Sequence, residues 1–84
     1  MKAYYVTFRS ITFAQRAKAR LEAEGMDCTL RRTPKWMETQ GCGYCLVIRV
    51  PVGTMAVALL RRERLEFRKT YLMKEDGSME EVWL

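Results

Sequence analysis

The sequence predicts an α+β domain with a ferredoxin-like, split βαβ arrangement, in which a four-stranded antiparallel sheet carries two helices on one face. The first observation is the length of 84 residues, which suits one small domain. The second is that two segments with helical apolar spacing alternate with short strand-like segments in the order βαββαβ. The third is a change in composition, which divides the chain into a domain over residues 1–74 and an acidic tail over 75–84.

The first half of the chain predicts a strand, a helix and a second strand. Residues 3–8 are rich in aromatic and β-branched side chains, which is typical of strands. Ser10 or the threonine two residues later can cap a helix whose apolar residues recur every four positions, and Gly25 ends it. Residues 26–32 alternate between apolar and polar, so the strand there turns Cys28 inward.

The second half predicts a loop, a strand, a helix and a last strand. Residues 33–44 contain a proline and two glycines without regular periodicity, which indicates a loop. A strand follows over 45–50, and Pro51 and Gly53 are expected to stop it. We expect a helix over residues 54 to about 63 and a strand over 66–73.

Composition and charge restrict the function. The chain has no histidine, which excludes a histidine-based catalytic triad and an imidazole zinc site. No apolar stretch is long enough to span a membrane, so we expect a cytoplasmic protein with reduced thiols and no membrane partner. Residues 1–74 carry all fifteen cations and six of the ten anions, whereas 75–84 carry the other four anions. The basic part favours anionic partners such as nucleic acid, phosphates, hydrosulfide or hydroselenide.

The segment Gly41-Cys42-Gly43-Tyr44-Cys45 is the strongest candidate for chemistry. Two thiols at this spacing can form a disulfide, supply half of a tetrahedral metal site, or let one sulfur resolve an intermediate on the other. A complete thiolate metal site needs two such pairs, and only Cys28 remains, so we expect no metal within one chain. Gly41 and Gly43 favour access of an anion to the sulfurs and the backbone N–H groups. The alternative is that Cys45 is a buried strand residue and Cys42 a loop thiol.

Four cations are expected to converge on this cysteine pair: Arg31, Arg32, Lys35 and Arg49. Positive neighbours lower the pKa of a thiol and stabilise anionic adducts, which is the role we predict for them.

Two other classes of function stay open. An RRM-like RNA-binding module would use Tyr4, Tyr5, Phe8 and Tyr44 on the first and third strands, and residues 43–47 partly follow the RNA motif of the third strand. An interaction domain that dimerises through sheet edges or the uncovered sheet face would need no thiol chemistry.

The sequence resembles the small bacterial selenium/sulfur carrier protein-like family over nearly its whole length. The resemblance is carried by Tyr5-Val6-Thr7-Phe8, by Ser10 and a helix with Ala14, and by Gly25, Thr33-Pro34-Lys35 and Cys42-Gly43. It implies that Cys42 bears the chalcogen, beside Gly43, and that Pro34 and Lys35 correspond to a Pro-Arg pair. Lysine at that position lacks the two-point donor geometry of arginine.

The resemblance implies a carrier rather than an enzyme, with no cofactor. We expect a persulfide or selenosulfide on Cys42, which is then delivered to a partner enzyme, and a resolving role for Cys45. Donor and acceptor proteins are the expected partners, together with a second copy of the chain in a homodimer.

Overall fold

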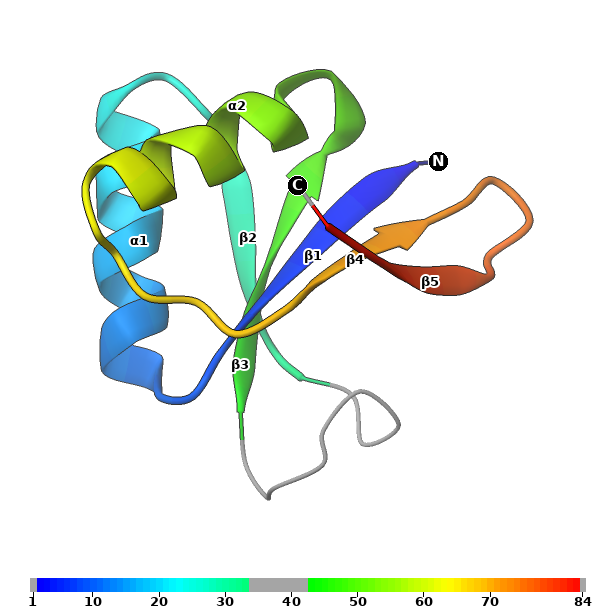
Figure 1. Ribbon diagram of the computed structural model, residues 1–84, viewed down its shortest axis with the longest axis horizontal. Coiled ribbons are helices and arrows are strands. Elements are labelled where there is room, and N and C mark those ends of the chain that lie inside the picture. Colours follow the sequence, from blue (N-terminus) through cyan, green and yellow to red (C-terminus); the bar gives the residue numbers. More distant parts are fainter. Residues whose placement is uncertain (1, 34–42, 84) are drawn as a thin grey trace.

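The computed structural model describes residues 2–33 and 43–83 of the chain (Figure 1). Two helices and five strands occur in these residues. In chain order they are β1 (Ala3–Phe8), α1 (Ile11–Ala23), β2 (Cys28–Arg32), β3 (Tyr44–Arg49), α2 (Val50–Arg62), β4 (Thr70–Met73) and β5 (Met79–Val82). Neither helix is long and apolar enough to cross a bilayer.

The strands form one antiparallel sheet in the order β2-β3-β1-β4-β5, so β1 is the central strand. The expected α+β class is confirmed, but the expected count of four strands is wrong. A turn after β4 brings residues 79–82 back along that strand, because Lys74 N donates to Ser78 O at 2.8 Å and Gly77 adopts a φ of +88°. The Asp76 carboxylate accepts the Ser78 N–H at 2.9 Å and stabilises the turn. The ferredoxin-like classification stays a prediction.

The core lies between one face of the sheet and both helices. On β1, Val6 and Phe8 alternate with outward residues, and their register partners on β3 are Leu46 and Tyr44. Both helices place small and aliphatic side chains against this face: Ala14, Ala17 and Leu21 from α1, and Ala56, Val57, Leu59 and Leu60 from α2. Because side chains alternate along a strand, Thr7 and Cys45 belong to the opposite face of the sheet.

Helix α1 begins and ends as the sequence predicts. The Ser10 hydroxyl accepts the Phe13 N–H at 3.4 Å, so Ser10 is the N-cap. Gly25 follows the helix with a φ of +80°, a conformation that favours glycine.

Helix α2 begins at Val50, four residues earlier than expected. Pro51 lies in the first turn, where a missing N–H costs no helical hydrogen bond, so this proline starts the helix instead of separating it from the strand. Gly53 likewise lies within the helix instead of stopping the strand, and the absence of a Cβ there leaves room for the Tyr4 ring. A Cβ at Gly53 would lie 1.9 Å from Tyr4 Cδ2.

The last predicted strand is shorter than expected, because the chain leaves the regular ladder before Thr70. The Thr7 hydroxyl accepts the Lys69 N–H at 3.0 Å, while Thr7 N donates to Lys69 O at 2.8 Å. Arg68 N donates to Thr7 O at 2.7 Å. Residues 68 and 69 are therefore fixed to β1 without being part of a strand.

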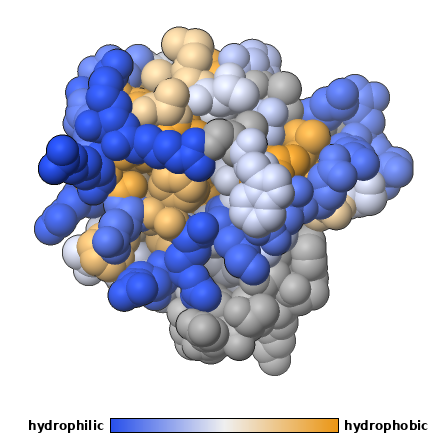
Figure 2. All heavy atoms as spheres, in the orientation of Figure 1, coloured by the Kyte–Doolittle hydropathy of each residue, from blue (hydrophilic) through white to orange (hydrophobic). Residues whose placement is uncertain are grey.

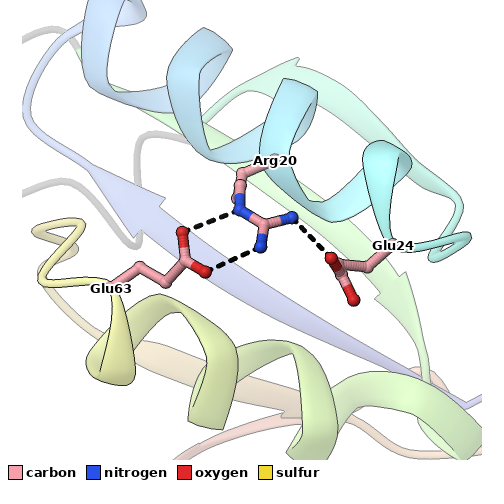
Figure 3. Close-up of polar contacts among 3 residues, drawn as sticks. All are labelled: Arg20, Glu24 and Glu63. Atoms are coloured by element: carbon pink, nitrogen blue, oxygen red, sulfur yellow. Dashed lines mark hydrogen bonds and ion pairs between the residues drawn. The ribbon is translucent and has the colours of Figure 1, made fainter.

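The two helices are joined at the surface by Arg20 (Figure 3). Its Nε and Nη2 donate to the two carboxylate oxygens of Glu63, each at 2.7 Å, and its Nη1 donates to Glu24 at 2.8 Å. The guanidinium lowers the pKa of the Glu63 carboxyl. This two-point ion pair connects α1 to the residue that ends α2.

Candidate functional site

The structure describes five of the eight predicted site residues. These are Gly43, Cys45, Arg31, Arg32 and Arg49, whereas Lys35, Gly41 and Cys42 lie outside the described residues, as does Pro34.

The cysteine segment enters the sheet at the end where β2 finishes and β3 begins. Thr33 N donates to Gly43 O at 3.0 Å, one step beyond the pairing of Arg32 with Tyr44. Gly43 is buried. Because Cys42 is bonded to Gly43, the predicted chalcogen-bearing residue immediately precedes this hydrogen-bonded end of the sheet.

Cys45 lies inside the sheet, with Thr7 of β1 on one side and Arg31 of β2 on the other. Its side chain is 0% exposed. It lies on the face opposite the helices, since its neighbour Leu46 belongs to the core. The expected accessibility of the sulfurs therefore does not hold for Cys45. The position in β3 buries this thiol, whatever freedom the neighbouring glycines provide.

Burial raises the pKa of the Cys45 thiol, because the thiolate would be poorly solvated there. The nearby Thr33 hydroxyl and the Arg31 guanidinium lower that pKa and partly offset the effect of burial. Thr33 Oγ1 is itself buried and has no hydrogen-bond partner within the described part of the chain. The hydroxyl is close enough to influence the thiol without forming a hydrogen bond of ordinary geometry. Burial therefore favours the protonated form of the Cys45 thiol.

The described arginines do not all converge on the cysteines. Arg31 is the direct cross-strand neighbour of Cys45. Arg32 lies on the other face, with its guanidinium carbon 5.8 Å from the centroid of the Tyr44 ring. Arg49 ends β3, five residues from Tyr44, or about 16 Å away at the usual rise of a strand. The structure thus brings Arg31 to the thiol and leaves Arg49 at the far end of the sheet.

Cys28 lies on β2, packs partly against the core and pairs with Ile48 across the sheet, as its inward position in the sequence pattern predicts. Burial raises the pKa of its thiol as well. No cluster of three acidic, histidine or cysteine side chains suited to a metal ion occurs among residues 2–33 and 43–83.

The aromatic residues considered for RNA binding face mostly toward the helices. Phe8 is buried in the core, Tyr4 packs against Gly53, and Tyr44 packs partly against the core. Tyr5 lies on the opposite face, paired with Val47. The structure therefore does not present these four rings as one stacking surface.

Sequence reasoning missed Thr33 as a part of this site. The signal was present, because Thr33 follows Arg31 by two positions and so continues the face of β2 that holds the neighbour of Cys45. Because residues 33–44 were expected to form a loop, Thr33 was not considered part of this strand face.

The fold and the site together define a small α+β thiol protein, in which a CxxC segment leads into an inner strand of an antiparallel sheet. The chain belongs to the family described as "Putative Se/S carrier protein-like", which matches residues 3–72. This range contains β1 to β3 and both helices and ends within β4, so β5 lies beyond it. Comparisons with curated proteins and with solved structures gave no match.

Proposed function

We propose that the chain carries sulfur or selenium as a persulfide or selenosulfide on Cys42 and delivers it to an acceptor protein. Membership of the carrier-like family is the observation that supports this function most directly. The family match includes Cys42 and Cys45. Gly43, which lies between them, is held at the end of the sheet by the hydrogen bond from Thr33 N to Gly43 O. Because the thiols have to return to the reduced state, we infer a reducing, cytoplasmic setting.

Loading is a transfer without net oxidation. The Cys42 thiolate attacks the outer sulfur of a donor persulfide, the S–S bond of the donor breaks, and the donor leaves as a thiolate that takes up a proton. Cys42 then holds the sulfur as a persulfide, and the selenium case follows the same bond changes. Lys35 and Arg31 supply positive charge for the thiolate and the persulfide anion, while Gly41 and Gly43 keep side-chain bulk away.

Unloading without an acceptor thiol can use Cys45. Its thiolate attacks the inner sulfur on Cys42, hydrosulfide leaves, and a Cys42 to Cys45 disulfide remains, which a dithiol reductant later reduces. Three residues of extended chain would place the two Cα atoms about 10 Å apart, beyond the roughly 7 Å limit of a disulfide. Resolution therefore requires a backbone turn at Gly43. Because Cys45 is also buried, we expect resolution to be slower than loading.

The test is intact mass spectrometry under non-reducing conditions after incubation with glutathione persulfide. We expect the wild type and Cys45→Ser to gain the mass of one sulfur and Cys42→Ser to gain none. Cys45→Ser should keep the added sulfur longer, because internal release is blocked. Cys28→Ser is the matched control and should behave as the wild type. Equal sulfur uptake by Cys42→Ser would refute the proposal.

A further inference from the structure

A second surface includes Arg9, which lies at the same end of the sheet as Gly43 of the cysteine segment. One pocket of about 290 Å³ is lined by Arg9, Phe13, Glu66, Phe67 and Arg68. A neighbouring pocket of about 480 Å³ shares the last three of these residues and adds Arg61 and Arg64. The two pockets are therefore neighbours along residues 66–68. We call this pair of pockets the arginine groove and define it by Arg9, Arg61, Arg64, Arg68, Phe13 and Phe67.

The fold brings these side chains together from separate parts of the chain. Arg9 follows β1, and Phe13 lies in the first turn of α1. Arg64 has a φ of +58°, and Leu65 N donates to Leu60 O at 2.8 Å, so the chain turns sharply at the end of α2. The hydrogen bond from Arg68 N to Thr7 O then fixes the returning segment against β1.

The groove carries a strong positive charge. Four exposed arginines line it, and Glu66 supplies the one carboxylate among its described lining residues. The charge of the neighbouring Glu63 is partly compensated, because both of its oxygens accept hydrogen bonds from Arg20 on α1 (Figure 3). Figure 2 shows strongly hydrophilic side chains around a small apolar patch on the side of the molecule where α2 ends.

The aromatic rings distinguish between the anionic partners that this charge could attract. Phe13 and Phe67 are only half-buried, and the Arg61 guanidinium carbon lies 5.4 Å from the centroid of the Phe67 ring. Bases of single-stranded nucleic acid stack on such rings and on guanidinium planes, while arginines hold the phosphates. Glu66 can accept a hydrogen bond from a base amino group.

We propose that the arginine groove binds single-stranded nucleic acid through its phosphates and through base stacking. The proposal does not depend on the carrier function, because neither Cys28 nor Cys45 lines the groove and its recognition uses charge and ring stacking instead of thiol chemistry. If Arg9, Arg61 and Arg64 each neutralise one phosphate, the logarithm of the affinity should fall with that of the salt concentration at a slope of about −2.1. A fourfold rise in salt should then weaken binding by about 18-fold.

Fluorescence anisotropy with a labelled single-stranded RNA of about 12 nucleotides tests this proposal. The groove variant combines Arg9→Gln, Arg61→Gln and Arg64→Gln. The matched control, Lys2→Gln with Arg49→Gln and Lys74→Gln, removes the same charge near the end of the sheet where Ala3 pairs with Arg49 and Met73. We expect the groove variant to lose at least tenfold in affinity and about two units of salt slope, and the control to stay within about threefold of the wild type.

Three further measurements complete the test. Phe67→Leu should weaken binding by about fivefold or more, because one stacking ring is lost. Circular dichroism of each variant shows whether the fold is kept, and Cys42→Ser should bind as the wild type does. Equal affinity of the groove and control variants would overturn the proposal. Competition by polyglutamate as effective as that by unlabelled RNA would also overturn it, since the groove would then recognise an acidic protein segment.

Discussion

Replacing Thr33 by valine should stabilise the protein, although it removes a polar group beside Cys45. The Thr33 hydroxyl is buried, with 8% of the residue exposed, and its oxygen has no hydrogen-bond partner in the described part of the chain. Thr33→Val keeps the branched shape and the backbone hydrogen bond from Thr33 N to Gly43 O. The substitution therefore removes only an unsatisfied buried hydroxyl.

The expected magnitude follows from the cost of such a group, which is about 1–3 kcal/mol. Thr7→Val is the matched control, because Thr7 is the other threonine near Cys45 and is 7% exposed. The Thr7 hydroxyl accepts the Lys69 N–H at 3.0 Å and donates to Lys69 O at 3.3 Å. Removing it leaves the Lys69 N–H without a partner, so Thr7→Val should destabilise the protein by about 1–3 kcal/mol.

Urea unfolding and thermal denaturation measure both changes. For a domain of this size, 1 kcal/mol corresponds to a shift of about 4–8 °C in Tm, so the two variants should differ by at least about 8 °C. Thr33→Val should also raise the pKa of the Cys45 thiol, because the hydroxyl lowers it in the wild type. If Thr33→Val were as destabilising as Thr7→Val, the hydroxyl would have a partner and the reasoning would be wrong.

Three further predictions concern packing, charge and thiol reactivity. In urea titrations, Gly53→Ala should lower the free energy of unfolding by about 1–3 kcal/mol, because the new Cβ clashes with the Tyr4 ring. In a Tyr4→Ala background the clash is absent, and Gly53→Ala should stabilise the protein by about 1 kcal/mol. Because the ion pair lowers the pKa of Glu63, its stabilisation is present above pH 4.5 and is lost as the pH falls through the lowered value. Acid unfolding should therefore be shallower in Arg20→Gln than in the wild type. Iodoacetamide labelling followed by peptide mass mapping should show Cys45 reacting only when urea opens the fold, and labelling of native Cys45 at pH 7 would contradict its burial.

The regular elements could be predicted where a single signal determines them. Alternation fixed the inward face of β2, and a serine cap with a trailing glycine defined α1. The start of α2 was misplaced because proline disfavours strands and also favours the first helical turn, and only packing decides between these uses. β5 was missed because its acidic composition resembles a solvated tail. Its pairing depends on the turn around Gly77 and on the free edge of β4.

Residue spacing predicted the cysteine pair of the candidate site but not how the fold surrounds these residues. The cysteine pair was visible in the sequence, but the burial of Cys45 depends on its register between Thr7 and Arg31, which no local pattern contains. The proximity of Arg49 was expected from its strand, yet position along that strand separates it from the start of β3. The arginine groove was not predicted at all, because its residues come from four elements or connections that only the folded chain brings together.

Arg9 of the arginine groove lies at the end of the sheet where the cysteine segment enters β3. Phe8 of β1 pairs with Tyr44 of β3. Arg9 follows Phe8 and Gly43 precedes Tyr44, so both residues lie at the same end of these adjacent strands. A polyanion held at Arg9 would add negative charge near the start of β3, where the proposed persulfide is also an anion. Like charges disfavour each other, and such coupling between two sites is reciprocal. We therefore expect a loaded carrier to bind nucleic acid less tightly than the free thiol form.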